Sequence, residues 1–261
     1  MSGRVSWIAI APVKGLALQQ VDSAEVTRRG VIGDRDFLIV DEHDRMISAV
    51  RIGPLLQVRA EHDRADNELL LHFPDGTVTG GPIELGADEH IDFGRLNMPV
   101  QAVLGEHSAA LSAQAGQPLR LVAAPPLRGG VDRGPLGAVT LLSTASLQRL
   151  QEQSGSPDPV DARRFRMTFG VEGLEPHEED SWKDREVRVG EAVLRVNGHV
   201  GRCVLTTRDA DSGDVDFPTL KLLAAYRGED AIDSTEPLPF GVHASVSTPG
   251  RVALHDPVAL L

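Results

Sequence analysis

Short apolar runs alternate with polar turns along the first third of the chain, a pattern typical of β-strands. The runs predict strands over residues 5–13, 23–27, 36–40, 46–50, 55–60, 68–73 and 77–85. The polar residues 41–44 separate two of these strands and predict a hairpin, and Pro-Asp-Gly at 74–76 predicts another turn. Residues 1–95 are therefore predicted to form a strand-rich N-terminal domain.

The pattern changes after residue 95, where helix and strand signals alternate. Helices are predicted over 106–115, from 144 to 153 and after residue 218, and strands over 119–123, 139–142, 186–189, 192–196 and 252–260. Ser143 or Thr144 is expected to cap the second helix. The segment 125–137 is rich in Pro, Gly and Arg and is expected to be a mobile or site-forming loop. The chain is thus predicted to be α/β with predominant β, and residues 96–261 to form its second domain.

Composition and charge narrow the classes of function. Hydrophobic residues make up 41% of the chain and charged residues 25%, which is ordinary for a soluble globular protein. The formal net charge of −12 argues against non-specific nucleic-acid binding, although it is compatible with a local basic pocket for a small anion. No apolar run reaches the roughly 18–20 residues of a membrane span, and Pro12 and Lys14 interrupt any signal-peptide core. We therefore expect neither nucleic acid nor membrane as a partner.

Basic residues recur beside apolar segments. Arg163, Arg164 and Arg166 lie in DARRFRMTF, Arg35 lies in GDRDF, and Lys14 follows APV. Each of them, taken alone, is read equally well as a solvated surface charge. Arg35 and Arg166 stand beside apolar residues, where an arginine is costly without a partner, and a guanidinium is a good ligand for phosphate. Several arginines converging in an acidic protein indicate an anionic ligand.

Cys203 is the only cysteine, so it cannot form an internal disulfide, and a cytoplasmic location is expected. Composition favours reading it as a small buried apolar residue. As a nucleophile it would need a base such as His199, but no recognised protease signature surrounds it. A structural zinc site lacks further ligands at suitable spacing. A soft thiolate can also be the single protein ligand of a metal held otherwise by an organic cofactor, and Arg202 would favour the thiolate.

Seven motifs in order span nearly the whole chain: APVKG, GVIGDRDFLIVDEHDRMISA, LLSTASLQRL, RRFRMTF, EEDSWKDREVRVGEAVLRV, GRCVLTTRDADSG and TPGRVALHDPVALL. Together they resemble the MOSC family, named after the C-terminal domain of molybdenum cofactor sulfurase. Within it the chain is most similar to the two-domain group of the mitochondrial amidoxime-reducing component and bacterial reductases of N-hydroxylated compounds.

The resemblance implies a MOSC β-barrel with peripheral helices, preceded by a smaller N-terminal MOSC α/β domain. It implies a molybdenum–molybdopterin cofactor whose metal is held by Cys203, which would also be the catalytic residue. Pyridoxal phosphate is not expected. The implied cofactor-binding residues are Lys14, Gly15, Arg35, Arg166, Thr168, Gly201 and Arg202.

Two of these positions depart from the family pattern. Gly15 stands where the family often has serine, so a side-chain hydrogen bond to the cofactor is lost there. Met167 and Thr168 stand where Pro-Asn is common, and Thr168 can still donate a hydrogen bond.

The activity implied by the resemblance is reduction of a small N-hydroxylated or N-oxygenated compound, whose oxygen leaves as water. An iron–sulfur domain would need four cysteines, so the electrons are expected from a separate protein, either a ferredoxin or a cytochrome b5-like protein with its reductase. Two alternatives stay open: a molybdenum cofactor or sulfur carrier without turnover, and a MOSC protein repurposed in biosynthesis.

Overall fold

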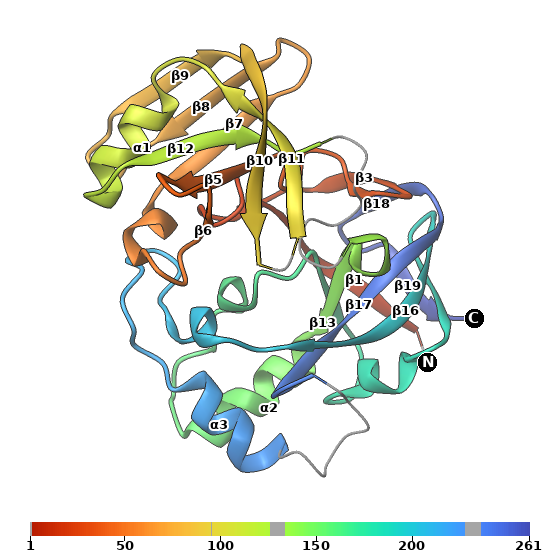
Figure 1. The fold of residues 1–261 in the computed structure, drawn as a ribbon. Coiled ribbons are helices and arrows are strands. Elements are labelled where there is room, and N and C mark those ends of the chain that lie inside the picture. The colour runs from red at the N-terminus through yellow and green to blue at the C-terminus, as the bar shows by residue number, and fades with distance from the viewer. Residues whose placement is uncertain (1, 95, 126–133, 228–235) are drawn as a thin grey trace.

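The computed structural model describes residues 2–94, 96–125, 134–227 and 236–261, which fold into two lobes (Figure 1). The barrel lobe contains the first strand of the chain and most of residues 139–260, and the sheet lobe contains most of residues 37–123. Strands predominate over helices in both lobes, which confirms the predicted fold class.

The barrel lobe is built on a closed ring of strands. Seven strands of the described residues form it, namely β1 (Ser2–Ile10), β13 (Val139–Ser143), β14 (Phe169–Glu172), β15 (Glu186–Val189), β16 (Ala192–Gly201), β17 (Pro239–Thr248) and β19 (Pro257–Leu260). Their order is β14-β13-β17-β16-β15-β19-β1, and β1 closes the ring on β14. The pair β13 and β14 is parallel, whereas the other pairs in the ring are antiparallel.

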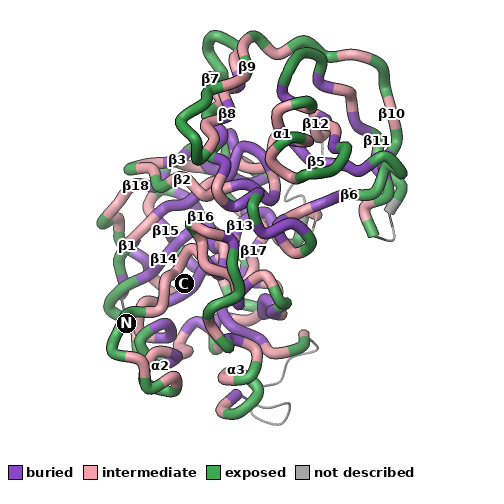
Figure 2. Tube along the Cα trace, turned by 90° about the vertical axis from the view of Figure 1, so that its left-hand side faces the viewer, coloured by how far each residue is buried: buried purple, intermediate pink, exposed green. Residues whose placement is uncertain are grey.

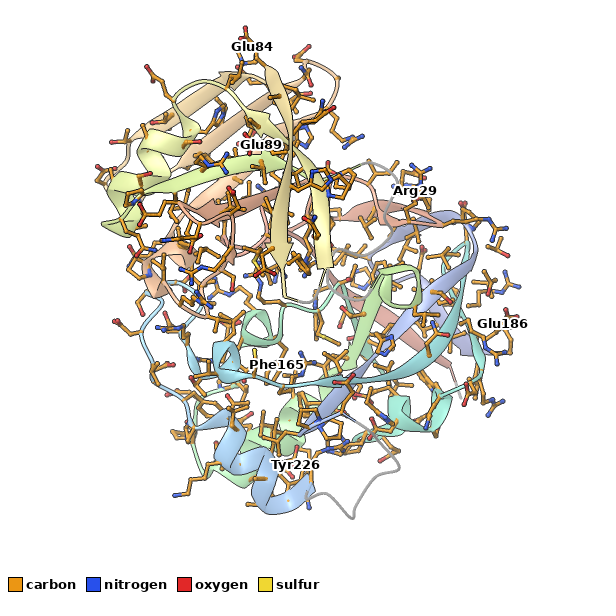
Figure 3. All side chains as sticks on the ribbon, in the orientation of Figure 1. Arg29, Glu84, Glu89, Phe165, Glu186 and Tyr226 are labelled. Carbon is orange, nitrogen blue, oxygen red and sulfur yellow. The ribbon has the colours of Figure 1, made fainter. Side chains whose placement is uncertain are left out.

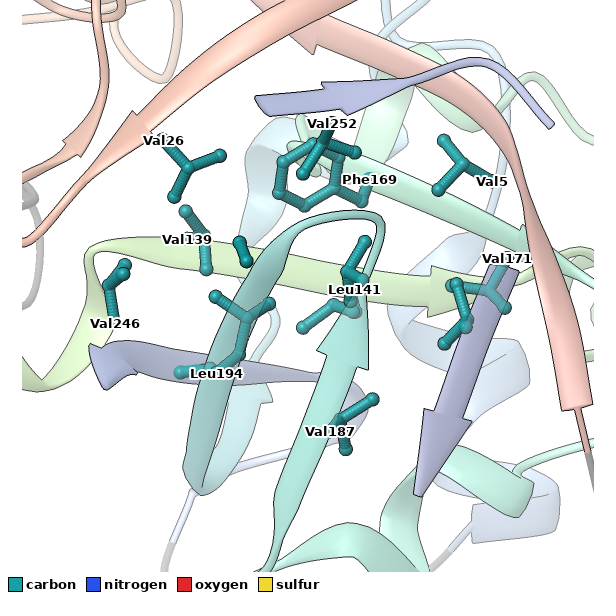
Figure 4. Close-up of a cluster of buried hydrophobic side chains, with 14 of the residues drawn as sticks. Val5, Val26, Val139, Leu141, Phe169, Val171, Val187, Leu194, Val246 and Val252 are labelled. Carbon is teal, nitrogen blue, oxygen red and sulfur yellow. The ribbon is translucent and has the colours of Figure 1, made fainter. Parts of the chain in front are cut away.

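Strand alternation fills the barrel with apolar side chains, because successive residues of a strand point to opposite faces. In β15, Val187 and Val189 are buried while Arg188 is exposed. Figure 4 shows Leu141, Phe169 and Val187 among the buried side chains of the resulting core.

The sheet lobe consists of two sheets and a helix. The larger sheet has the strand order β10 (Leu85–Phe93), β11 (Leu96–Val103), β12 (Leu119–Ala123), β5 (Phe37–Asp41) and β6 (Met46–Ile47). The smaller sheet is β7 (Arg59–Asp63), β8 (Glu68–His72) and β9 (Val78–Pro82). Helix α1 (His107–Ala115) packs on β12, and its Leu111 is fully buried in a core shared by both sheets.

A third, small sheet joins early and late parts of the chain. Strand β3 (Ser23–Thr27) lies between β4 (Gly30–Val31) and β18 (Gly250–Ala253), and β2 (Gln19–Gln20) pairs with β1. Val26 and Val252 from this sheet cover the barrel core.

Two α-helices cover one end of the barrel, α2 (Thr144–Ser154) and α3 (Thr219–Arg227), and Figure 2 shows exposed residues along them. The Ser143 side chain accepts a hydrogen bond from the Ser146 amide at 3.0 Å, so the predicted cap of this helix is confirmed. The short 3-10 helices are η1 (Gly53–Gln57), η2 (Gly134–Gly137), η3 (Ala162–Phe165), η4 (Glu178–Trp182) and η5 (Val204–Thr207).

One local prediction was wrong, and one pair of strands was not predicted. Residues 55–57 belong to η1 rather than to a strand, because Pro54 favours the start of a helical turn, and the strand begins at Arg59. The hairpin of β10 and β11 was not predicted, since most residues of β10 are exposed or half-buried and give little apolar alternation.

Two other predictions stay untested. The domain boundary near residue 95 remains a prediction, and β10 and β11 pair with each other on either side of it. The predicted loop 125–137 falls largely on residues 126–133, which lie outside the described residues. No described helix has the length and the apolar content needed to cross a membrane.

Candidate functional site

A pocket of about 920 Å³ lies between the two lobes. Its wall includes Leu85 and Met98 from the sheet lobe and Thr140 from the barrel lobe. All eight site residues predicted from the sequence line this pocket: Lys14, Gly15, Arg35, Arg166, Thr168, Gly201, Arg202 and Cys203. The fold therefore brings together residues that are spread over most of the sequence.

The pocket is basic although the protein is acidic. Its described lining holds seven basic and two acidic side chains: Lys14, Arg29, Arg35, Arg64, Arg164, Arg166, Arg202, Asp34 and Asp36. A cleft lined mainly by one sign of charge concentrates ligands of the opposite sign. The pocket thus favours an anionic ligand in a chain whose net charge is −12.

Lys14 and Gly15 form a tight turn at one side of the pocket. The Lys14 amide donates to the Phe37 carbonyl at 2.9 Å, which ties the turn to β5. Gly15 has a φ of +95°, and a Cβ there would lie 3.0 Å from the Ser48 Cα. The backbone conformation and the close neighbour both favour glycine at this position.

Arg35 and Arg166 meet across the pocket. Both have left-handed backbones, with φ of 58° and 53°, an uncommon conformation for residues other than glycine. The Arg35 Nη2 donates to the Arg166 carbonyl at 3.3 Å, and Asp34 forms an ion pair with the Arg35 guanidinium. Asp34 also accepts a hydrogen bond from the amide of Ala11, the residue after β1, at 2.8 Å. The backbone at Ala11 thus holds Asp34, which in turn holds the Arg35 guanidinium.

Thr168 is buried and pairs with Thr140. The Thr168 amide donates to Thr140 Oγ1 at 2.9 Å, the Thr140 amide approaches Thr168 Oγ1 at 3.3 Å, and the two hydroxyls are 3.2 Å apart. The hydroxyl of Thr168 therefore helps to join the start of β14 to β13, in addition to lining the pocket.

Arg202 turns its side chain into the barrel lobe. Its Nε donates to the Phe240 carbonyl at 2.8 Å and its Nη1 to the Phe165 carbonyl at 3.0 Å, while Nη2 lies 3.0 Å from the Met167 sulfur. The guanidinium also lies over the ring of Phe165, which lines the pocket and is labelled in the barrel lobe in Figure 3. These contacts fix the segment before Arg166 relative to Cys203.

Gly201 and Cys203 flank that arginine. A Cβ at Gly201 would lie 2.6 Å from the carboxylate of the flexible Glu236 side chain and 3.1 Å from the Pro237 carbonyl, so the position leaves little room for a side chain. Cys203 is exposed on the pocket wall and directly precedes η5, where its carbonyl accepts hydrogen bonds from the Thr206 amide and hydroxyl. The reading of Cys203 as a buried apolar residue was therefore wrong, because the end of β16 places it at the surface.

The surroundings of Cys203 weaken two other readings of the sequence. His199 is buried on β16, 3.5 Å from the Asp180 carboxylate, and it is not among the described residues that line the pocket. Among the described residues, no group of three or more His, Cys, Asp or Glu side chains could hold a metal ion. A nucleophile paired with His199 and a metal site made of protein ligands alone are both disfavoured.

Sequence reasoning missed several pocket residues. Arg29 comes from the turn before β4, Arg64 from the turn after β7, and Arg164 from η3, where it is buried and paired with Asp216. Exposed turn arginines resemble ordinary surface charges in sequence, so only the topology could reveal Arg29 and Arg64. Arg164 had a signal, since it lies in the basic run beside Arg166.

A histidine, His177, packs against aromatic rings at the far end of the barrel lobe, where Figure 3 shows Tyr226 on α3. His177 packs between the rings of Tyr226 and Phe240, each with its centroid 5.8 Å away. Both His177 ring nitrogens are buried without a hydrogen-bond partner among the described residues. Burial, followed by the charges of Arg227 and Arg149, lowers the pKa of His177 from 6.5 to about 4.

We expect His177 to make the protein acid-sensitive. Below pH 6.5 the unfolded chain takes up a proton at this histidine, whereas the folded protein does so only near pH 4. Stability should therefore fall as the pH drops through this window, by about 1–2 kcal/mol once partial exposure is allowed for. Urea unfolding at pH 7, 5.5 and 4 should show a smaller acid loss in His177→Phe than in the wild type. The exposed His90→Gln is the control, and identical acid losses in the wild type and His177→Phe would contradict the expectation.

Comparison with known proteins adds two family matches. The sequence model of the MOSC domain matches residues 128–259, and that of the MOSC N-terminal beta barrel domain matches residues 2–111. The first covers half of the chain, and the two together cover most of it.

Individual relatives agree with these matches. A mitochondrial amidoxime-reducing component 1 from Xenopus laevis is 28% identical over 98% of this chain and 81% of its own length. A molybdenum cofactor sulfurase from Oryza sativa subsp. japonica is 27% identical over 84% of this chain, but the match covers only 30% of the sulfurase. The solved structure of the YUAD protein from Bacillus subtilis has a TM-score of 0.50 at 13% identity, covering 99% of this chain and 94% of that chain. That last likeness concerns the fold alone.

Proposed function

The chain belongs to the MOSC domain family, and from that premise we propose that it binds a molybdenum cofactor through Cys203 and reduces N-hydroxylated compounds. The observation that carries the proposal is the position of the Cys203 thiol. It is exposed on the wall of a large basic pocket that lies between the two lobes.

The residues of the pocket fit such a cofactor. A thiolate is a soft ligand that suits molybdenum, and the dithiolene of the pterin would supply other ligands, so a single cysteine suffices. The pocket volume of about 920 Å³ falls in the range of pockets that hold cofactor-sized ligands. The surplus of basic side chains suits the phosphate of the pterin.

The chain's own residues have distinct roles in this proposal. Lys14, Arg35 and Arg166 bind the phosphate or the pterin ring, and the Arg35–Arg166 contact keeps two of them in fixed relative positions. Gly15 and Gly201 line the pocket and pack closely against Ser48 and Pro237, which fixes the backbone beside Lys14 and Cys203. Arg202 positions Cys203, because its donors are directed to carbonyls of the barrel lobe.

When bound, the metal centre would supply the two-electron chemistry that removes oxygen from nitrogen. The protein would hold the non-reacting part of the substrate against apolar residues of the wall, of which Ile32, Leu85 and Met98 are examples. The half-exposed Ile32 and Leu85 give the wall an apolar section. A ferredoxin or a cytochrome b5-like protein with its reductase is proposed as the electron donor.

Protein purified from a host that makes the cofactor should contain about one molybdenum atom per chain. With an artificial electron donor it should reduce a hydroxylamine or an amidoxime to the corresponding amine or amidine. Consumption of the N-oxygenated compound can be followed by chromatography of the product. Stoichiometric molybdenum without turnover of any such compound would contradict the proposed reaction and leave only the cofactor site.

A carrier function without turnover is the second candidate. The similarity to a molybdenum cofactor sulfurase favours it, as does the exposure of Cys203, which could carry a persulfide. Mass spectrometry of the intact protein separates the candidates, since a persulfide adds one sulfur to Cys203 and a reductase needs none.

A further inference from the structure

A second, smaller cavity adjoins the large pocket. Its volume is about 260 Å³, and it shares three lining residues with the large pocket: Arg164, Arg166 and Leu205. The rest of its wall comes from both lobes, including Leu18 and Gln57 on one side and Arg208 on the other.

Arginine dominates this smaller cavity. Five arginines and one acidic residue are among its described lining residues: Arg59, Arg163, Arg164, Arg166, Arg208 and Asp211. We call it the arginine cavity.

Carboxylates already neutralise several of these arginines. Arg163 forms ion pairs with Asp161 and Asp211, both at 2.6–2.7 Å, and Arg164 forms one with Asp216 at 2.6 Å. Arg59 is half-exposed and pairs with Glu61 at 3.1 Å. These arginines shape the cavity more than they add uncompensated charge to it.

Arg208 differs from them. Within the described part of the chain no carboxylate lies within ion-pair distance of its guanidinium. Nη1 donates to the Gly213 carbonyl at 2.6 Å and Nη2 to the Val50 carbonyl at 3.4 Å, while the buried Nε has no hydrogen-bond partner among the described residues. Arg208 is only partly buried, and a guanidinium whose contacts are carbonyls rather than carboxylates favours a nearby anion.

The backbone holds Arg208 in place. Gly53 and Gly213 meet face to face, and a Cβ at Gly53 would lie 2.4 Å from the Gly213 carbonyl and 2.6 Å from Arg208 Nη1. The two lobes can approach this closely only because both residues are glycine. Arg208 is thus a fixed cation at the junction of the lobes, unlike a flexible surface arginine.

We propose that the arginine cavity is a phosphate-binding subsite, in which Arg208 is the principal cation for a phosphate group of a phosphorylated ligand. Its volume of about 260 Å³ equals that of roughly nine water molecules, at about 30 Å³ each in the liquid. That space admits a phosphate with an attached sugar-sized group. Arg166 lines both cavities, so one ligand can extend from the large pocket into this one. The phosphate then belongs either to a separate phosphorylated metabolite or to a nucleotide extension on the bound cofactor. The second source rests on the proposed function.

Titration calorimetry with inorganic phosphate and guanosine 5′-monophosphate tests the subsite without molybdenum. Arg208→Gln should weaken binding of the nucleotide at least tenfold, Arg208→Lys should retain part of it, and the exposed Arg188→Gln should leave it unchanged. Thermal melting of each variant checks its fold. Binding that is lost in Lys14→Gln but unchanged in Arg208→Gln would place the anion in the large pocket and overturn the proposal. Failure of both probes to bind the wild type would overturn it too.

The source of the phosphate is tested on protein from a cofactor-competent host. Acid release of about one nucleoside monophosphate per molybdenum, reduced in Arg208→Gln, supports a nucleotide extension. No released nucleotide, together with Arg208-dependent binding of guanosine 5′-monophosphate, supports a separate phosphorylated ligand. If the protein contains no molybdenum but still binds the nucleotide through Arg208, the subsite stands and the proposed reductase function fails.

Discussion

Replacing Cys203 with alanine is expected to remove nearly all molybdenum from protein purified from a cofactor-competent host. In the proposed site this thiolate is the single protein ligand of the metal, and an alanine methyl group cannot replace it. The fold should hardly change, since Cys203 is exposed and surface substitutions usually alter stability by less than about 0.5 kcal/mol. Molybdenum per chain by plasma mass spectrometry and the melting temperature measure the two effects separately.

The neighbouring Val204→Ala is the matched control for Cys203→Ala. Val204 is 43% exposed and is not among the described residues that line the large pocket, so its loss should leave the molybdenum content unchanged. A normal molybdenum content in Cys203→Ala would show that other residues hold the metal.

Replacing Arg202 with leucine is expected to destabilise the protein by about 3 kcal/mol and to lower its molybdenum content. The change leaves the buried carbonyls of Phe165 and Phe240 without their arginine donor, at about 1–3 kcal/mol for each unsatisfied group. It also frees the segment before Arg166. Urea unfolding measures the first effect and metal analysis the second.

Two variants sharpen this test. Arg188→Leu makes the same change at an exposed position of β15 and should alter stability by less than about 0.5 kcal/mol. Arg202→Lys keeps the charge but lacks the planar fork, so it should fall between the wild type and Arg202→Leu. Full stability of Arg202→Leu would contradict the positioning role.

The sequence identified which residues line the pocket better than it predicted their orientations. Cys203, Arg35 and Arg166 were identifiable because the resemblance fixed their positions, and all three line one pocket. The orientation of Arg202 was not predictable, because the sequence Arg202-Cys203 does not determine which side of the end of β16 the arginine side chain faces. Arg208 was not predicted as a site residue for a related reason: the position of its guanidinium depends on Gly53, which is distant in sequence.

The fold followed the sequence where the apolar signal was strong and departed from it elsewhere. Strand β5 is entirely buried, and its run Phe-Leu-Ile-Val was easy to identify. Strand β10 has mostly exposed or half-buried residues and owes its place to pairing with β11, a contact that no local apolar pattern encodes. That hairpin carries Leu85 and Met98 to the pocket, so the part of the wall that would contact substrate was the least predictable.

The closure of the barrel by β1 has a consequence for the order in which the protein folds. Arg4 pairs with Glu172 on one side and with Pro257 on the other, so β1 finds its two neighbours in the barrel ring only after strands made much later in synthesis are available. Such long-range pairings slow folding, because a large loop must close before they form. The residues after β1, Lys14 and Gly15 among them, depend on the same late step. The pocket is therefore expected to be among the last parts of the protein to assemble, and cofactor loading to follow the completion of the chain.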